Sequence, residues 1–181
     1  MLSGKIFIYL LLSLLLTATF ANAQRDSLVA RSFRTHDLND RHSLFMENEN
    51  RPLPAKGEQT YSITITVTDI RNKNGVIRFK FYDDATPFPD DKGFLRIVVP
   101  KSEIIDNTFT ATYYGFTSQS MGIALQDDEN NNWKLDLGWF FPKEGHAFSD
   151  YYHTSLRRPV YSDFRFLLLG DKKVIMKMKY Y

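Results

Sequence analysis

From Tyr61 onward, short segments of this chain alternate apolar and polar residues one by one, and this alternation constrains the fold more than any other feature. Successive side chains of a β-strand point to opposite faces, so a spacing of two places all the apolar residues on one face. The apolar members of the clearest segments are Ile63, Ile65 and Val67; Ile77, Phe79 and Phe81; Phe109, Ala111 and Tyr113; and Val174, Met176, Met178 and Tyr180. The pattern predicts strands that each bury one face.

Turn signals separate these segments. Asn74-Gly75 lies between the first two and is typical of a tight β-hairpin. Gly170-Asp171 is expected to turn between the last two segments, which would then pair with each other. Seven or eight short strands of this kind, with no convincing helix after residue 60, predict an all-β fold, an antiparallel β-sandwich.

The N-terminal 23 residues have the features of a secretory signal peptide. Lys5 supplies a positive charge, an uncharged apolar run follows, and "ANA" at 21–23 offers the small residues that signal peptidase requires. A membrane anchor is the alternative, but the run of about 15 residues is short of the roughly 20 that a span needs. We therefore expect cleavage before Gln24, an exported protein, and no transmembrane segment in the mature chain.

The rest of the chain divides into two parts. Residues 24–59 are polar and mixed in charge, which predicts a flexible leader, and residues 60–181 form the expected β-sandwich domain. The chain contains no cysteine, so disulfides cannot stabilise it and a hydrophobic core or a metal must do so. The net charge of +2 falls to +1 when Lys5 is removed, which argues against a nucleic-acid partner.

Between Asp128 and Asp136, oxygen-bearing groups recur at every second position. The set consists of Asp128, Asn130, Asn132, the main-chain carbonyl of Lys134, and Asp136. This is the spacing of a loop that wraps a calcium ion, and Glu144 or water could complete the coordination. If the loop binds calcium, its departures from an EF-hand predict a weak site of the extracellular class, with a Kd of roughly 10⁻⁴ to 10⁻³ M.

The same loop departs from an EF-hand in two places. Trp133 stands where the loop needs glycine for its sharp turn, and Trp139 stands where a bidentate glutamate is expected. The alternative interpretation is an Asp/Asn-rich turn whose side chains bond to its own backbone. The sequence leaves both interpretations open.

The C-terminal half also carries an ordered series of short motifs. "DDENNNWKLD" spans 127–136, "PKEG" spans 142–145 with Phe148-Ser149 after it, and "RPVYSDFRF" spans 158–166. In this order the motifs resemble domain of unknown function 2141, a family of exported bacterial proteins. Asp127 stands at the family's histidine and Trp133 at its usual glycine.

The resemblance implies a β-sandwich of the immunoglobulin-like or transthyretin-like kind and a Gram-negative setting, in which the protein would be periplasmic or secreted. It implies no activity. The long loop region from 127 to 159 is the elaborated end of the predicted sandwich, and such loops commonly carry binding sites. The ligand-contacting residues that we predict there are Trp133, Trp139, Glu144, His146 and Tyr151.

Two functions follow from these features. The first is a non-catalytic binding or structural module of the cell envelope, whose partner is an envelope protein or a carbohydrate. The alternative is a hydrolase that acts on envelope or glycan substrates through the 144–153 loop, with Glu144 or His146 as the titrating group.

Overall fold

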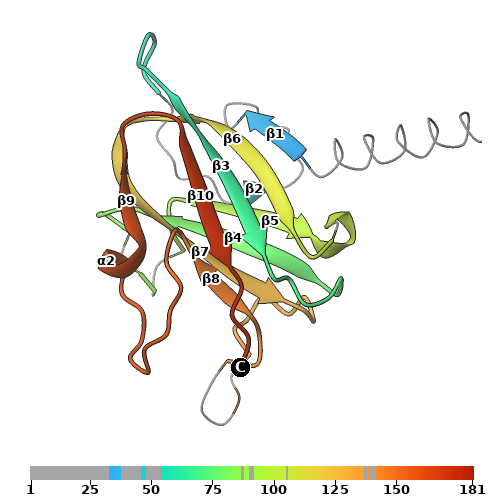
Figure 1. The fold of residues 1–181 in the computed structure, drawn as a ribbon. Helices are drawn as coiled ribbons and strands as arrows, with labels where there is room; N and C mark the ends of the chain where they lie inside the picture. The colour runs from blue at the N-terminus through green and yellow to red at the C-terminus, as the bar shows by residue number, and fades with distance from the viewer. Residues whose placement is uncertain are drawn as a thin grey trace, which may run out of the picture.

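The computed structural model describes residues 54–86, 88–89, 92–104, 106–136, 138 and 142–181, together with two strands at 33–37 and 46–47. The chain forms two β-sheets packed face to face (Figure 1). This confirms the prediction of an all-β sandwich, and eight of the described strands follow residue 60. The predicted signal peptide and Trp139 lie outside the described residues.

The smaller sheet has four strands, in the order β1 (Phe33–Asp37), β6 (Phe109–Phe116), β3 (Tyr61–Thr68) and β10 (Lys172–Lys177). The larger sheet follows the order β2 (Met46–Glu47), β5 (Leu95–Pro100), β4 (Val76–Tyr82), β7 (Gln119–Asp128) and β8 (His146–Phe148). Its sixth strand, β9 (Arg165–Leu168), also pairs with β7. Two single turns of helix, η1 (Lys101–Glu103) and α2 (Tyr161–Phe164), complete the described elements.

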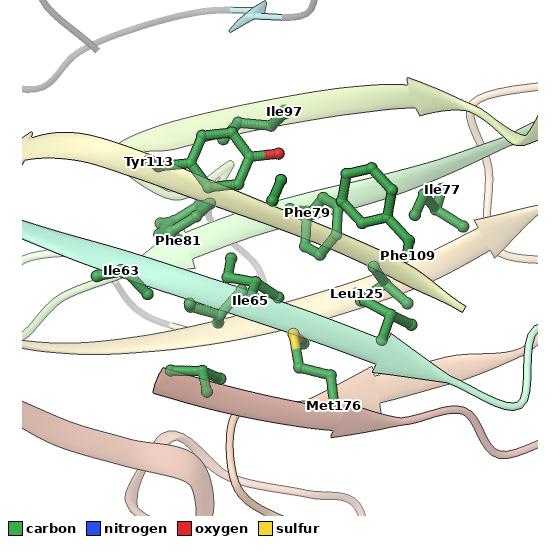
Figure 2. Close-up of a cluster of buried hydrophobic side chains, with 14 of the residues drawn as sticks. Ile63, Ile65, Ile77, Phe79, Phe81, Ile97, Phe109, Tyr113, Leu125 and Met176 are labelled. Carbon is green, nitrogen blue, oxygen red and sulfur yellow. The ribbon is translucent and has the colours of Figure 1, made fainter. Parts of the chain in front are cut away.

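The core lies between the two sheets and is built by the alternating residues (Figure 2). Ile63, Ile65 and Val67 of β3 are fully buried, as are Ile77, Phe79 and Phe81 of β4. Burying each such side chain contributes about 1.5–3 kcal/mol. The period-two pattern therefore identified the core-facing residues correctly.

The pairing of the strands differs from the prediction in two places. Asn74-Gly75 does not close a hairpin, because β3 and β4 belong to different sheets. Gly75 instead has a φ of 71° and lies against the Asp128 carbonyl, where any side chain would collide. A glycine is therefore needed at position 75, where the chain crosses from one sheet to the other.

The predicted last pair is also wrong. β9 pairs with β7 in the larger sheet, whereas β10 pairs in parallel with β3 in the smaller one. Gly170 and Asp171 thus carry the chain from one sheet to the other. Because β1 and β6 are parallel as well, the sandwich is not purely antiparallel.

Strands β1 and β2 come from the polar segment 24–59 that we expected to be a flexible leader. β1 pairs with β6 and β2 pairs with β5, and each forms the edge of its sheet. No helix in the part of the chain described here has the length and apolar character needed to cross a membrane.

Candidate functional site

The outer face of the six-stranded sheet, which points away from the core, is covered by the loop region that follows β7. A second, smaller hydrophobic cluster of Tyr82, Phe148 and Phe164 lies there. Phe88 packs edge-to-face against all three, with ring centroids 5.0–5.9 Å apart. Both faces of β4 are therefore covered, although its alternation suggested a solvent-facing polar side.

Beside this cluster, strands and loops border a cavity of about 670 Å³ that is open to solvent on one side. Its floor is the outer face of β4, β7 and β8, and its walls come from the turn at Phe88, the loop after β7 and residues 153–159. The lining side chains that the argument uses are Arg78, Lys80, Phe88, His146, Phe148 and Arg158. We call this cavity the outer-face pocket.

Lys80 projects from the centre of β4 into the outer-face pocket and is half-buried. Arg96 of β5 lies directly across the strand pair, and Arg78 is two residues away on the same face. Burial lowers the pKa of the Lys80 ammonium, and the charges of Arg96 and Arg78 lower it further. Among the described residues, Lys80 has no carboxylate or other hydrogen-bonding partner.

Arg78 is almost fully buried and forms an ion pair with Asp128, which is completely buried. The guanidinium of Arg78 stacks on the indole of Trp133, and its central carbon lies 4.3 Å from the ring centroid. Trp133 has a φ of 67°, the left-handed conformation expected at a position that suits glycine. Half of the surface of Trp133 remains exposed.

His146 lies on β8 with its ring between Phe148 and Tyr181. Burial and the nearby charge of Lys179 lower the pKa of His146 to about 4, so the ring is neutral at pH 7. Its Nδ1 is buried and has no hydrogen-bond partner among the described residues. His146 is thus the one predicted ligand-contacting residue that both lines the pocket and has a strongly perturbed pKa.

The acidic loop is closed by bonds among its own groups. Asp128 accepts backbone N–H bonds from Asn132 and Trp133, both at 3.1 Å. The amide groups of Asn130 and Asn132 both donate to Asp136, at 2.6 and 3.0 Å. These contacts are those of the Asp/Asn-rich turn, and no cluster of three or more Asp, Glu or His side chains within the described residues is placed to hold a metal.

Calcium binding by this loop stays a hypothesis, and the contacts within the loop would make binding cost free energy. A cation would have to displace Arg78 from Asp128 and turn two amide groups away from Asp136. We expect thermal unfolding to be unchanged between excess EDTA and millimolar calcium, with magnesium as the control. A calcium-specific rise of several degrees that disappears in Asp128→Ala/Asp136→Ala would show instead that the loop binds the ion.

The remaining predicted residues have mainly structural contacts. Glu144 is 96% buried and lies under the acidic loop, where its Oε2 accepts bonds from Gln126 and from the Asp136 backbone. Tyr151 packs on Phe148, and its hydroxyl lies 3.0 Å from His153 Nδ1. Neither Glu144 nor Tyr151 lines the outer-face pocket.

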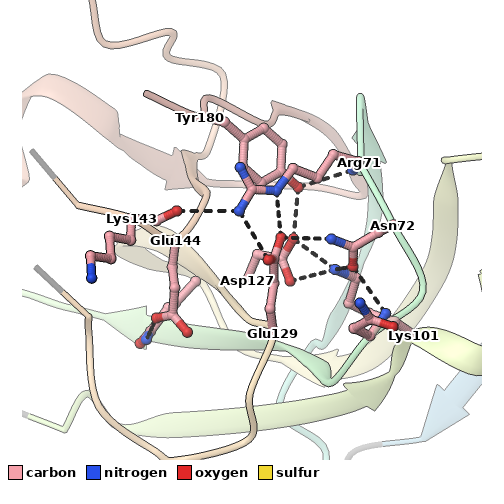
Figure 3. Close-up of polar contacts among 10 residues, drawn as sticks. Arg71, Asn72, Lys101, Asp127, Glu129, Lys143, Glu144 and Tyr180 are labelled. Carbon is pink, nitrogen blue, oxygen red and sulfur yellow. Dashed lines mark hydrogen bonds and ion pairs between the residues drawn. The ribbon is translucent and has the colours of Figure 1, made fainter. Parts of the chain in front are cut away.

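At the end of the sandwich, a buried ion pair joins segments that are far apart in the sequence (Figure 3). Lys101 is completely buried, and its Nζ lies 2.7 and 2.9 Å from the two oxygens of Asp127. Asn72 accepts a third bond from the same ammonium, and the Tyr180 hydroxyl donates to Asp127 at 2.7 Å. We call Asn72, Lys101, Asp127 and Tyr180 the clasp.

A more exposed ion pair continues the clasp toward solvent. Arg71 binds Glu129 through two N–H groups, at 2.6 and 2.9 Å, and lies over the ring of Tyr180. Burial raises the pKa of Asp127, while the bonds from Lys101 and Tyr180 oppose that change. None of the four clasp residues lines the outer-face pocket. We therefore regard the clasp as structural.

Comparison with known proteins gives one match. No curated protein and no solved structure is significantly similar to this chain. A family model described as "uncharacterized protein conserved in bacteria", DUF2141, matches residues 65–177, which include every strand from β4 to β10 and the second half of β3. The chain therefore belongs to the DUF2141 family, as the motifs in its C-terminal half indicated.

Proposed function

We propose that the protein is an exported, non-catalytic binding module that holds a small ligand in the outer-face pocket. The observation that carries this proposal is the size and construction of the pocket. A cavity of about 670 Å³ is within the range of roughly 300–1,000 Å³ typical of small-molecule sites. Mostly apolar walls with a few polar groups on a rigid sheet are also typical of such sites.

Export is supported by the N-terminal sequence and by the way the fold is stabilised. The predicted signal peptide precedes a domain without cysteine, and the described residues build a large core together with the buried clasp. Such a domain needs no particular redox environment. The envelope protein or carbohydrate predicted as a partner would then present a group that enters the pocket.

A hydrolase is the second candidate, and the observation in its favour is neutral His146 in the pocket wall. The other groups that it would need lie elsewhere. Glu144 does not line the pocket, and the Ser149 hydroxyl is buried in bonds to the Phe164 carbonyl and the Ile123 amide. Because the described lining residues include no carboxylate to orient or assist His146, binding is the better supported role.

Native mass spectrometry of the protein recovered from the envelope fraction tests the proposal. We expect a non-covalent small-molecule adduct on the wild type, weakened when Ala124→Trp fills the floor of the pocket or Ser155→Trp crowds its rim. Ile175→Trp, on an exposed strand face outside the pocket, is the matched control. Equal adducts on all four proteins would place binding elsewhere, and no adduct on a correctly folded wild type would count against a ligand-binding role.

A further inference from the structure

The charges that surround the outer-face pocket are all of one sign. The lining residues include Arg78, Lys80, Arg157 and Arg158, and among the described ones there is no aspartate or glutamate. The other titratable lining residues are His146, His153, Tyr82 and Tyr181. The wall is therefore basic, although the whole chain is nearly balanced in charge.

Most of these groups are already engaged by the protein itself. Arg157 forms a two-bond ion pair with Asp163, at 2.5 and 2.7 Å. His153 Nε2 lies 2.8 Å from the Arg157 carbonyl, which can only accept, so this nitrogen donates there, and Nδ1 lies 3.0 Å from the Tyr151 hydroxyl. With Arg78 held by Asp128 and His146 neutral, two cations remain for a ligand, Lys80 and Arg158.

These two cations are placed very differently. Arg158 is an exposed residue of the outer loop. Lys80 is fixed on the central part of β4, half-buried, and its charged neighbours on the sheet face are Arg78 and Arg96. Asp128 forms an ion pair with Arg78, and Glu47 of β2 is the backbone partner of Arg96, one strand farther from the pocket.

A half-buried ammonium between two guanidinium groups is unfavourable unless an anion compensates it. The Nε of Arg96 is likewise buried without a hydrogen-bond partner among the described residues. In the same pocket, the rings of Phe88 and Phe148 provide an apolar wall. One kind of ligand satisfies both features, namely an oxyanion attached to a flat apolar body.

We infer that the outer-face pocket is an oxyanion site, in which the Lys80 ammonium pairs with a carboxylate or phosphate whose apolar body packs against Phe88 and Phe148. This inference rests on the proposed binding function and specifies its ligand class. The ammonium supplies attraction that a neutral ligand cannot use, so the pocket discriminates by charge as well as by shape. Raising the pH lowers affinity, because the amine loses its charge.

Three matched probes test this directly: 1-naphthoate, 1-naphthyl phosphate and neutral 1-naphthalenemethanol, each titrated into the folded protein and followed by amide NMR. We expect both anions to shift amides of β4, β7 and β8, with affinities roughly tenfold or more above that of the alcohol. The preferred anion distinguishes a carboxylate from a phosphate ligand. Lys80→Met, which keeps the length of the side chain, removes the advantage of the anions.

Lys173→Met, on an exposed face of β10, controls for general loss of charge, and thermal unfolding of each variant controls for folding. If the alcohol binds the same amides as tightly as the anions, the pocket binds ligands but the oxyanion assignment is wrong. An advantage of the anions that survives Lys80→Met and is lost in Arg158→Gln overturns the role of Lys80. If no probe shifts these amides, both this inference and the binding function fail.

Discussion

Replacing Asp127 by alanine is expected to destabilise the protein by about 3–5 kcal/mol, because it leaves the ammonium of Lys101 buried without a counter-charge. Lys101 is completely inaccessible to solvent, and two of its three bonds go to Asp127. The same change removes the acceptor of the Tyr180 hydroxyl. Urea denaturation, with the free energy of unfolding extrapolated to water, measures the loss.

Two further variants show whether the buried charge is the cause. Lys101→Met/Asp127→Leu removes both charges and is expected to recover most of the stability, since an apolar pair of similar volume commonly replaces a buried ion pair at little cost. Glu129→Ala breaks the neighbouring, partly exposed pair with Arg71 and is expected to cost about 1 kcal/mol or less. A loss below 1 kcal/mol for Asp127→Ala would mean that the clasp does not hold the fold together.

The second large effect is a loss of stability in mild acid that depends on His146. The pKa of His146 is about 4 in the folded protein, against an ordinary value near 6.5. As the pH falls, the imidazole is protonated in the unfolded chain before it is protonated in the folded protein. The contribution of His146 to the free energy of unfolding is therefore fully present above pH 6.5 and falls as the pH drops toward 4. The two pKa values differ enough for a loss of about 3 kcal/mol, which levels off below pH 4.

Comparing wild type with His146→Gln isolates this contribution from the carboxylates that titrate at lower pH. The difference in unfolding free energy between the two proteins should change by up to about 1.4 kcal/mol per pH unit between pH 6.5 and 4. It should be constant above pH 7. Parallel curves across the whole range would mean that the imidazole is solvated when protonated and that the pocket wall around it opens readily.

The sequence identified the strands well because alternation is a local signal. Ile63, Phe79 and Met176 are all core residues, as their spacing predicted. The pairing was partly wrong because a tight turn has the same sequence whether it closes a hairpin or crosses between sheets. Gly75 and Gly170 do the second, and only the packing of the two sheets decides which occurs.

The candidate site shows the same limit. The sequence directed attention to the loop region after β7. His146 lines the outer-face pocket, and Trp133 packs on Arg78, which also lines it. The sequence did not single out Lys80 and Arg78, which line the pocket, because a charged residue on the polar side of a strand normally faces water. Nothing local shows that a loop some fifty residues later in the chain folds over that side.

Lys101 was missed for a related reason. It follows Pro100 at the end of a strand, where a lysine is ordinarily solvated. Asp127 appeared to be part of the acidic loop, yet it points the opposite way from Asp128 and binds Lys101 and Tyr180. The two partners of this buried ion pair lie in different segments of the chain, with no fixed spacing between them. A sequence pattern therefore cannot detect the pair.

The parallel pairing of β3 with β10 determines when the fold can form. Ser62, at the start of the domain, donates its backbone N–H to Asp171, 109 residues further along. Tyr180, which closes the clasp, is synthesised later still. Strand β3 must therefore wait for β10 before its sheet is complete, so folding has a high contact order and is slow. The export that we propose would carry the chain across a membrane while it is unfolded, and it would benefit from that delay, because the smaller sheet cannot close before β10 has emerged.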